Sequence, residues 1–460
     1  MMKICVYTLG CRLNQCESEA IADAFAKRDF SVVPDGDPAD LYIVNTCTVT
    51  SKAEQKARRM IRKYACEPQS PTVVVTGCYA QLDSDEIAAL DGRVVVVPLD
   101  KKANMLDLPE YASARLLEGF SLLEACRAFA GLDGDALASL RVGPSVEDNG
   151  VKSTIISPFD YDAATFSYHC RAYLKIQDGC DNACAFCRVH VARGAAVSLD
   201  AAEVIRRALA LERQGFHEIV LTGVNLTMYD HRGDGLGGLL RHLLSALGTD
   251  IRLRLSSLEP DHVDDLLLDQ LADPRMQPHF HVPVQSASDA VLARVNRRYS
   301  VEHLSYVIER MRQVKDDPFI AADVITGLPA EGDAEFQETY EFFVKNRFAQ
   351  MHVFPFSPRP DTPLFHAKDR VPESIRDDRA AALRTLSNRL HDDYVRRQRG
   401  KRLEVILEQR KKGAWYGLAG NYLKVRVLDV PPQAVAGDLL PVVMEPNGDG
   451  MVIPLVRVVK

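Results

Sequence analysis

The sequence predicts an α/β protein with three parts: an N-terminal open α/β sheet over residues 1–143, a central partial (β/α)6 barrel over 166–395 and a small β-barrel over 400–460. In the first third, near-continuous apolar, β-branched runs alternate with helical stretches, as in buried parallel sheets. From Tyr168 to about Pro363 a βα rhythm repeats six times, which favours a partial barrel. The C-terminal part alternates apolar and polar residues with a period of two, which is typical of short strands.

Composition limits the class of protein and its compartment. The chain has 460 residues, of which 47% are hydrophobic and 26% are charged, as in an ordinary globular protein. Met1–Gly10 lacks the layout of a signal peptide and no apolar run has the length of a membrane span, so we expect a cytoplasmic protein. In that compartment 11 cysteines favour metal or redox chemistry over disulfides. The net charge of −7 argues against nucleic-acid binding by the whole surface, so any RNA contact must be local.

Each of three predicted strands in the first part is followed almost at once by a cysteine. The strands Lys3–Thr8, Leu41–Asn45 and Thr72–Thr76 precede Cys11, Cys47 and Cys78, here called the N-terminal cysteines. Because the carboxyl ends of parallel strands meet at one edge of a sheet, we expect the three thiols to gather there. Thiolates suit iron–sulfur clusters, and three of them leave one iron of a cubane cluster open. The alternative is that these cysteines are buried and pack as small hydrophobic side chains.

Four further cysteines are expected to be buried and to pack as small hydrophobic side chains. Cys5 lies inside a predicted strand, and we expect the same role for Cys66, Cys126 and Cys170. Cys16 is the one credible substitute ligand, and we expect it to be a bystander on the helix that follows the first strand.

The central part is expected to contain six strands, preceded by a polar linker with two prolines over Pro144–Asp162. The strands are Ala172–Gln177, Glu218–Thr222, Arg252–Ser257, His279–Val284, Phe319–Ile325 and Met351–Phe356. Directly after the first strand comes C-x3-C-x2-C, formed by Cys180, Cys184 and Cys187, here called the barrel-loop cysteines. Three thiolates from one tight loop can hold an iron–sulfur cluster with an open iron. A closed Cys3His zinc site with His190 is the alternative, but a structural zinc site does not need this position at the carboxyl end of a barrel strand.

Small and polar residues follow several of the other strands. The motifs are LTGVN (Leu221–Asn225), LSSLEP (Leu255–Pro260), HVPVQSAS (His281–Ser288) and DVITGLPAE (Asp323–Glu331). Small residues let the backbone approach a ligand closely, and hydroxyl and amide groups can bind a ribose or an amino-acid head group. Ordinary turn chemistry is the competing interpretation for any single residue.

Several motifs in order give the chain a resemblance to a known family. The barrel-loop cysteines, with Phe186 before the last of them, resemble the signature of radical S-adenosylmethionine (SAM) enzymes, in which SAM chelates the open iron and is cleaved to a radical. Together with TLGCRLNQCESE, VNTCTVT and TGCYAQ, they resemble the radical SAM methylthiotransferase family, closest to the branch that acts on threonylcarbamoyladenosine beside the anticodon of tRNA.

This resemblance implies an activity, cofactors and ligand residues. It implies a transferase that replaces a C–H bond at C2 of the modified adenine with a methylthio group, using SAM as radical source and as methyl donor. It implies two 4Fe-4S clusters, one on each cysteine set, and an electron donor such as flavodoxin or ferredoxin. The residues that it assigns to SAM are Phe186 (near the adenine), Gly223, Asn225, Ser256, Gln285, Val324 and Gly327.

Two alternatives remain open. The same chemistry could act on isopentenyladenosine in tRNA or on a ribosomal-protein side chain, or the protein could be a non-enzymatic iron–sulfur RNA-binding regulator. The chain also departs from the usual family pattern: Arg188, Val189 and His190 stand where two aliphatic residues and a proline are usual. AAVSL replaces an arginine-rich run, GLPAE replaces GFPGE, and SAS replaces SGS.

Two stretches are candidates for RNA contact. Lys52–Tyr64 carries six cations against one acid, opposite an apolar stripe, and begins just after Cys47. Residues 401–460 hold nine Lys and Arg against six Asp and Glu, together with Trp415, Tyr416 and Tyr422, which suits RNA. This part resembles the TRAM RNA-binding domain, and its basic balance favours tRNA over a basic protein as the partner. Ser374–Gly400 is interpreted as a long helical connector.

Overall fold

The structure is a computed structural model that describes residues 1–28, 30–132, 136, 157–161, 170–445 and 453–459. Contacts between residues divide the chain into two units. The first combines Met1–Tyr168 with Arg188–Ala195, and the second combines His169–Cys187 with Ala196–Lys460. The central and C-terminal parts therefore fall in one unit, and the three-part division with its boundaries stays a prediction. Most of the linker expected over residues 144–162 lies outside the described residues.

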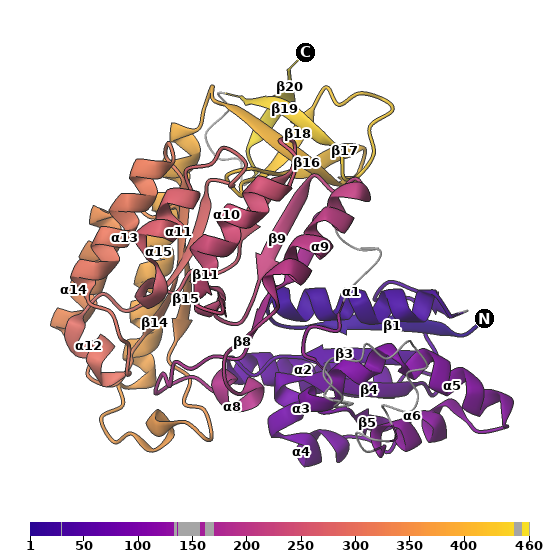
Figure 1. Ribbon diagram of the computed structural model, residues 1–460. Coiled ribbons are helices and arrows are strands. Elements are labelled where there is room, and N and C mark those ends of the chain that lie inside the picture. The colour runs from indigo at the N-terminus through magenta and orange to yellow at the C-terminus, as the bar shows by residue number, and fades with distance from the viewer. Residues whose placement is uncertain (29, 133–135, 137–156, 162–169, 446–452, 460) are drawn as a thin grey trace. The chain divides into compact units, whose positions relative to one another are not determined.

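The first unit contains a five-stranded parallel sheet in the order β2-β1-β3-β4-β5 (Figure 1). Its strands are β1 (Lys3–Thr8), β2 (Ser31–Val32), β3 (Leu41–Thr46), β4 (Thr72–Gly77) and β5 (Val94–Val96). The three strands expected from the sequence are confirmed as β1, β3 and β4. The strand order reverses between β1 and β3, and ligands bind outside the carboxyl ends of strands at such a switch point.

Helices cover both faces of this sheet. They are α1 (Arg12–Ala26), α2 (Ser51–Ala65), α3 (Cys78–Leu82), α4 (Ser84–Ala88), the 3-10 helix η1 (Leu99–Leu106), α5 (Leu108–Leu117), α6 (Leu122–Ala130) and α8 (Val189–Arg193). Ile43 and Val74 pack with Phe25 of α1 on one face. Their neighbours Val44 and Val75 point the other way and pack against α2, because successive strand residues face opposite sides.

The second unit contains six parallel strands in two ladders, β12-β9-β6 and β13-β14-β15. These strands are β6 (Ala172–Lys175), β9 (Glu218–Thr222), β12 (Arg252–Leu255), β13 (His279–Gln285), β14 (Phe319–Thr326) and β15 (Gln350–Pro355). Isolated bridges, Leu253–Met276 and Ser257–His281, continue from the first ladder toward the second. All six strands expected from the sequence are confirmed, with small shifts at their ends.

Helices separate these strands along the chain, as a βα rhythm requires. They are α9 (Ala201–Arg213), α10 (Leu236–Ala246), α11 (Asp265–Gln270), α12 (Asp289–Arg294), α13 (Val301–Val314), α14 (Asp333–Lys345) and α15 (Glu373–Arg397). Short elements complete the unit: β7 (Gln177–Asp178) paired with β8 (Val197–Ser198), β10 (Asp230–His231) paired with β11 (Asp234–Gly235), and the 3-10 turns η2 (Leu226–Met228), η3 (Pro260–His262) and η4 (Pro363–His366). The long connector helix expected near the C-terminal part is confirmed as α15.

The C-terminal part is a closed five-stranded barrel in the order β16-β17-β18-β20-β19, as the sequence predicted. Its strands are β16 (Arg402–Lys411), β17 (Ala414–Ala419), β18 (Lys424–Leu428), β19 (Leu439–Met444) and β20 (Leu455–Val458). Val425 and Val427 are buried inside it, whereas Lys424 and Arg426 between them face solvent. Within unit two, Phe319 of β14 belongs to the same apolar core as this barrel.

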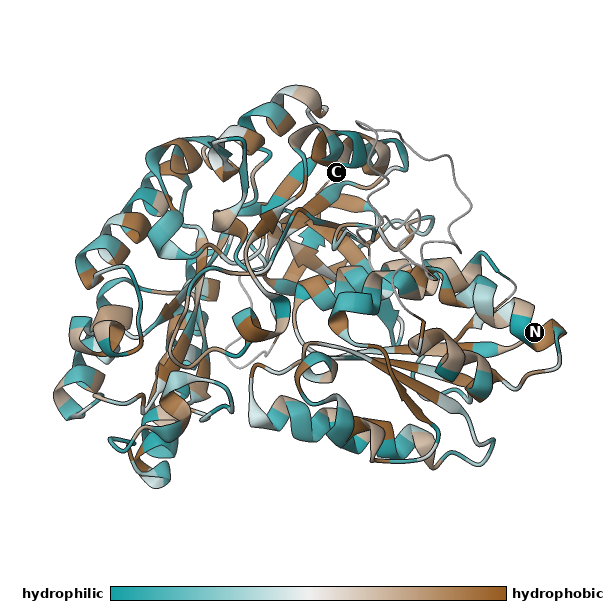
Figure 2. Cartoon of the chain, turned by 60° about the horizontal axis from the view of Figure 1, so that its bottom comes forward, coloured by the Kyte–Doolittle hydropathy of each residue, from teal (hydrophilic) through white to brown (hydrophobic). Residues whose placement is uncertain are grey.

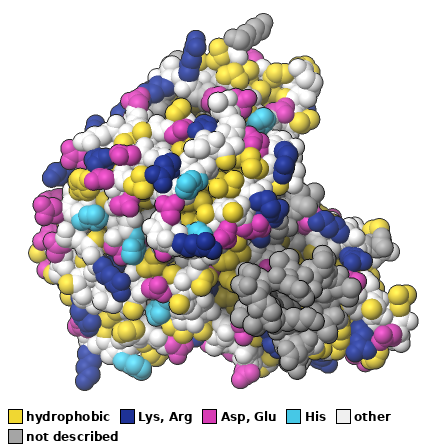
Figure 3. Space-filling view, in the orientation of Figure 1, with side chains coloured by type: hydrophobic (Ala, Val, Ile, Leu, Met, Phe, Trp, Pro, Cys, Tyr) yellow, Lys and Arg dark blue, Asp and Glu magenta, His cyan; other side chains and the backbone are white. Residues whose placement is uncertain are grey.

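The distribution of polarity follows these layers. Figure 2 shows apolar residues concentrated in the strands of both units, while the helices combine apolar and hydrophilic positions. In the view of Figure 3, cationic and acidic side chains are interspersed over the helices of the second unit. Among the described helices, none combines the length and the apolar content that a membrane crossing needs.

Candidate functional site

The N-terminal cysteines lie at the carboxyl end of the first unit's sheet, two of them flanking its switch point. Cys11 precedes α1 and follows β1, Cys47 follows β3, and Cys78 is the first residue of α3 after β4. The pKa of Cys47 is raised to about 12, mainly by burial and to a smaller extent by the neighbouring thiols of Cys11 and Cys78. These mutual effects show that the three thiols are close neighbours, whereas their role as cluster ligands stays a prediction.

Two glycines make this gathering possible. Gly10 precedes Cys11 with φ 106°, and a Cβ built on it would lie 2.7 Å from the Cβ of Cys47. Gly77 precedes Cys78 with φ 100°, and its Cβ would lie 2.3 Å from the carbonyl oxygen of Thr46. Only glycine accepts both this backbone conformation and such close approach. Steric constraints therefore explain why a glycine precedes the cysteine in the LGC and TGC motifs.

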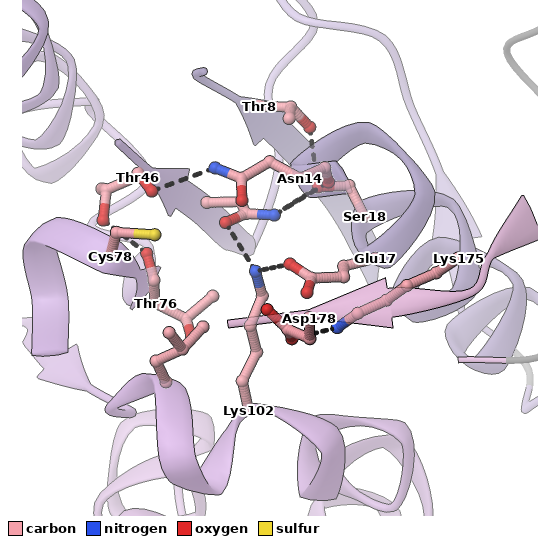
Figure 4. Close-up of polar contacts among 12 residues, drawn as sticks. Thr8, Asn14, Glu17, Ser18, Thr46, Thr76, Cys78, Lys102, Lys175 and Asp178 are labelled. Carbon is pink, nitrogen blue, oxygen red and sulfur yellow. Dashed lines mark hydrogen bonds and ion pairs between the residues drawn. The ribbon is translucent and has the colours of Figure 1, made fainter. Parts of the chain in front are cut away.

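A buried network of charged groups lies beside Cys78 (Figure 4). Lys102 and Glu17 form an ion pair with side chains that are 0% and 1% exposed. Arg193 approaches the same carboxylate with Nη1 3.2 Å from Glu17 Oε1, and its Nη2 donates to Asn14 Oδ1 at 3.0 Å. The Arg193 Nε–H also donates to Cys78 Sγ at 3.2 Å. Two cations thus share one buried carboxylate, and one of these cations, Arg193, lies directly against the Cys78 sulfur.

The helix that carries Arg193 follows the barrel-loop cysteines directly in the chain, yet it belongs to the first unit. Arg188, the residue after Cys187, forms two hydrogen bonds to Asp83, at 2.6 and 3.1 Å, and one to Glu54 at 3.3 Å. The Arg188 side chain is 3% exposed. This residue is one of the departures from the usual family pattern, and the structure accounts for it as a buried ion-pair partner.

The barrel-loop cysteines gather in the second unit after β6 and β7. The pKa of Cys184 is raised to about 12, mainly by burial; Arg297 opposes this rise, and Cys187 and Cys180 contribute to it. The Cys187 N–H donates to the Cys184 carbonyl at 3.0 Å, and Asn225 Nδ2 donates to Cys180 Sγ at 3.8 Å. The loop therefore presents three thiols of which one is already hydrogen-bonded to a predicted SAM residue.

Neither cysteine set has the spacing of a mononuclear metal site. Throughout the described ranges, the one group of three or more His, Cys, Asp or Glu ligand atoms that all lie within 4.8 Å of one another is His281, Asp323 and His352. Zinc bonds of about 2.0–2.3 Å require closely packed ligand atoms, so a preformed Cys3His zinc site with His190 is not found among the described residues. Thiols that influence one another from a wider spacing fit a multi-iron cluster better than a single ion.

The predicted SAM residues lie at or near the carboxyl ends of four strands and in the cysteine loop. Gly223 and Asn225 follow β9, and the Asn225 N–H donates to Gln177 Oε1 at 2.9 Å. Ser256 follows β12, and its buried Oγ makes no hydrogen bond among the described atoms. Gln285 ends β13 with φ 60°, an unusual conformation for a residue other than glycine. An unpartnered hydroxyl and a strained amide-bearing residue at strand ends are features that a bound ligand would explain.

The other two predicted positions, Val324 and Gly327, lie in β14 and just after it. The Val324 side chain is fully buried, so any ligand contact from this position would come from its backbone. Gly327 has φ 71° and its N–H donates to Glu331 Oε1 at 2.7 Å. A separate pocket of the second unit is lined by residues such as Asp181, Thr227 and His262, and none of the seven predicted SAM residues belongs to its described lining.

Comparison with known proteins agrees with both cysteine sets. Residues 3–98 match a model described as the uncharacterized protein family UPF0004, and residues 174–343 match the radical SAM superfamily. A relative from Treponema pallidum (strain Nichols), named "Threonylcarbamoyladenosine tRNA methylthiotransferase MtaB", is 37% identical, over 93% of this chain and 95% of its own. Proteins of the same name from Thermotoga maritima and Bacillus subtilis are 33% and 32% identical, over 91% and 92% of this chain and 88% and 90% of theirs.

The chain belongs to the MtaB methylthiotransferase family. The first matched region contains the N-terminal cysteines and the second contains the barrel-loop cysteines. A solved structure of the radical S-adenosylmethionine methyltransferase TsrM from Kitasatospora setae, with cobalamin and a [4Fe-4S] cluster bound, has a TM-score of 0.51, 14% identity and coverage of 79% of this chain and 77% of that one. At this identity the likeness concerns the fold alone, and it confirms the radical SAM type of barrel.

In this MtaB family member, sequence reasoning missed a buried ion pair beside the cysteine loop. Arg297 pairs with Glu259, and the Arg297 guanidinium lies 5.7 Å from the centre of the Phe186 ring. Burial alone would lower the pKa of Arg297, but Glu259 outweighs it and raises this pKa, so the guanidinium stays charged. The run Asn296–Arg297–Arg298 carried no motif, and Glu259 in LSSLEP was noted only as a carboxylate. Glu259 follows β12, but Arg297 lies in the loop between α12 and α13, so no signal in the sequence pairs them.

The remaining cysteines of this family member test the packing interpretation. Cys5 and Cys126 are buried, as expected, and Cys16 is buried in α1. Cys170 is half-buried. The expectation for Cys66 was wrong: this residue caps the end of α2 and is exposed, because the helix ends before it at the surface.

The two basic stretches of the chain are partly accessible. On α2, Ala57, Met60 and Tyr64 are buried, as the predicted stripe requires, and Lys52, Lys56, Arg59, Arg62 and Lys63 are exposed. Arg58 is an exception, because it donates to the hydroxyl of Tyr79. In the C-terminal barrel, Lys424 and Arg426 are exposed on β18. Both surfaces therefore keep cations available to a phosphate backbone.

Proposed function

We propose that this protein transfers a methylthio group to C2 of N6-threonylcarbamoyladenosine next to the anticodon in cytoplasmic tRNA, with SAM as both radical source and methyl donor. The observation that carries the proposal is the match to four proteins with that name, at 31–37% identity over 88–96% of their lengths. The printed name of these relatives favours this nucleoside over isopentenyladenosine and over a ribosomal protein.

The two cysteine sets supply the ligands that this chemistry needs. The barrel-loop cysteines would hold a 4Fe-4S cluster whose open iron binds SAM, and the N-terminal cysteines would hold a second 4Fe-4S cluster. When bound, the first cluster supplies the electron that cleaves SAM, and the second supplies the sulfur that is methylated and transferred. In both sets, mutual pKa effects and a spacing wider than that of a single ion support this assignment.

The surrounding residues orient and stabilise the thiolates. Asn225 donates to Cys180 Sγ, and the charged, buried Arg297 lowers the pKa of Cys184 against the effect of burial. In the first unit Arg193 donates to Cys78 Sγ. Hydrogen bonds to sulfur and nearby cations stabilise thiolates over thiols, and they tune a cluster's reduction potential.

The partners follow from this chemistry. The exposed cations of α2 and of the C-terminal barrel are proposed to contact tRNA phosphates, and the partly exposed Tyr416 on β17 is proposed to stack on a base. A reduced flavodoxin or ferredoxin is proposed as the electron donor, because SAM cleavage consumes one electron.

Mass spectrometry of tRNA nucleosides tests the proposal directly. Cells that lack this protein should lose 2-methylthio-N6-threonylcarbamoyladenosine, wild-type protein should restore it, and Cys184→Ala should not. A nucleoside profile that does not change on deletion would refute the tRNA assignment, and loss of a 2-methylthio-isopentenyl product instead would redirect it. Anaerobically purified protein should contain about eight irons per chain for two cubane clusters; four or fewer, or zinc instead, would refute the two-cluster assignment. A non-enzymatic regulator would bind RNA without cleaving SAM when reduced.

A further inference from the structure

A group of metal-ligand side chains lies on the second three-stranded ladder, away from both cysteine sets in the sequence. His281 is on β13, Asp323 on β14 and His352 on β15, and one ligand atom from each lies within 4.8 Å of the others. Two imidazoles and one carboxylate are a common ligand set for divalent transition metals. His281 and Asp323 are the first residues of the HVPVQSAS and DVITGLPAE motifs, but neither of them, nor His352, is among the residues assigned to SAM or to the clusters.

The strand register places the three side chains on one face. Asp323 is directly opposite His352 in the β14–β15 ladder, and His281 is opposite Ala321, two residues before Asp323. Residues two apart on a strand share a face, and so do residues directly opposite one another. The three ligands are therefore presented together by adjacent parallel strands, which hold their backbones rigidly.

The loop that contains the barrel-loop cysteines packs against the same face of the β13-β14-β15 ladder. Ile325 is two residues beyond Asp323 and packs in an apolar cluster with Ala185 and Phe186, which lie between Cys184 and Cys187. The three ligands thus lie on the ladder face toward which the cysteine loop packs. Gln285, a predicted SAM residue, is four residues beyond His281 on β13.

Two of the three ligand atoms are already in close contact. His281 Nε2 and Asp323 Oδ1 are 3.1 Å apart, so a ring nitrogen and a carboxylate oxygen face each other at a separation that two ligands of one cation can adopt. On the surface, His242 and Asp234 form a similar pair at 3.2 Å, but no third ligand from the described part of the chain joins them.

The proposed ligands can be reached from solvent. The Asp323 side chain is 27% exposed and His352 is exposed, so an ion and its water can reach the group.

We propose that His281, Asp323 and His352 bind a divalent transition-metal ion of the zinc type. Bonds of about 2 Å require the three ligand atoms to approach one another by about 1 Å, which side-chain rotation provides. Three protein ligands leave at least one coordination position for water or a substrate atom, as in catalytic rather than structural zinc sites. The site uses neither set of cysteines, so its zinc content can be measured separately from the iron of the proposed clusters.

Zinc binding by the full chain tests this proposal. The protein is reconstituted anaerobically with iron and sulfide so that its cysteines are occupied, treated with a chelator, dialysed against Zn2+ alone, and analysed for zinc and iron. Wild-type protein should hold one zinc per chain beyond its iron, and the double variant His281→Ala/His352→Ala should lose it. His242→Ala, which removes a His–Asp pair with no third ligand, is the matched control and should retain it.

Two further measurements make the result decisive. Zinc X-ray absorption should show nitrogen and oxygen ligands only, and sulfur ligands would mean that the ion sits on cysteines and would overturn the proposal. Equal zinc content in wild type and double variant, showing an adventitious ion only, would also overturn it. If the double variant loses iron and so fails to fold, His352→Gln at the exposed ligand should still weaken zinc affinity at least tenfold; unchanged affinity in that variant would refute the site.

Discussion

Replacing Arg193 by Gln should lower the reduction potential of a cluster held by the N-terminal cysteines. The Arg193 side chain is 2% exposed, and its Nε lies 3.2 Å from Cys78 Sγ. A positive charge at this position stabilises the more negative, reduced cluster. Glutamine removes the charge and keeps a polar side chain of similar length, so the reduced state loses this stabilisation.

The distance sets the size of the effect. Two unit charges 3.2 Å apart interact by about 1.3 kcal/mol at a dielectric constant of 80 and by about 5 kcal/mol at an effective value of 20. Since about 1.4 kcal/mol corresponds to 59 mV for one electron, the potential should fall by roughly 55 to 220 mV. The cluster's charge is spread over atoms farther away than Cys78 Sγ, so the lower half of this range is expected.

The assay needs a protein with one cluster. Alanine at all three barrel-loop cysteines leaves the N-terminal set as the sole proposed cluster site, and an EPR-monitored redox titration then gives its midpoint potential. Arg193→Lys, which retains the charge, is the matched control and should shift the potential much less. If Arg193→Gln retains its iron and its potential stays within about 20 mV of the parent, the reasoning about Arg193 is refuted.

Four further outcomes are expected. Arg254→Met should destabilise the fold by about 3 kcal/mol in urea unfolding, because the buried Glu218 carboxylate loses two hydrogen bonds and keeps the longer ion pair with Arg171, at 3.7 Å; a loss below about 1 kcal/mol would contradict this. Burial would raise the pKa of Glu218, but Arg254 outweighs it and keeps this pKa below its ordinary value. In the iron-free chain the ionised Glu218 should therefore stabilise the fold above about pH 4.3, and this stabilisation should be lost as the pH falls. Glu218→Gln should make the free energy of unfolding depend less on pH in this range. Gly327→Ala should cost about 1–3 kcal/mol and weaken SAM binding in equilibrium dialysis, since its backbone has φ 71° and the new Cβ would lie 1.9 Å from an arginine side chain of α15. Arg59→Gln on α2 should weaken tRNA binding and reduce the salt slope by about 0.7–0.9, whereas Arg206→Gln on α9 should leave both unchanged.

The fold was largely predictable because its strands can be recognised from the local sequence pattern alone. Buried parallel strands are short apolar runs of β-branched residues, so β14 was expected over Phe319–Ile325 and is found over Phe319–Thr326. The gathering of thiols at the sheet edge followed from the same rule, because strand order and direction bring carboxyl ends together. Cys66 was misplaced because helix periodicity says little about where a helix ends.

The buried cations could not be predicted in the same way. Arg188 and Arg193 lie next to the barrel-loop cysteines in sequence, but their partners Asp83 and Glu17 are more than a hundred residues away. A charged side chain in a short helix is usually solvated, and only the tertiary fold shows that its counter-ion is buried. The three proposed zinc ligands are similarly dispersed over β13, β14 and β15, where each looks like an isolated polar residue in a strand.

The assignment of residues 188–195 to the first unit limits how this protein can be divided or recombined. A fragment that stops at Tyr168 would lack both arginines and leave the carboxylates of Glu17 and Glu54 buried with fewer counter-ions. The two modules could be exchanged during evolution or in a chimera. Such an exchange would have to transfer residues 188–195 together with the N-terminal module to which they belong. An exchange of the two modules therefore needs three junctions in the chain, near residues 168, 187 and 195, instead of one.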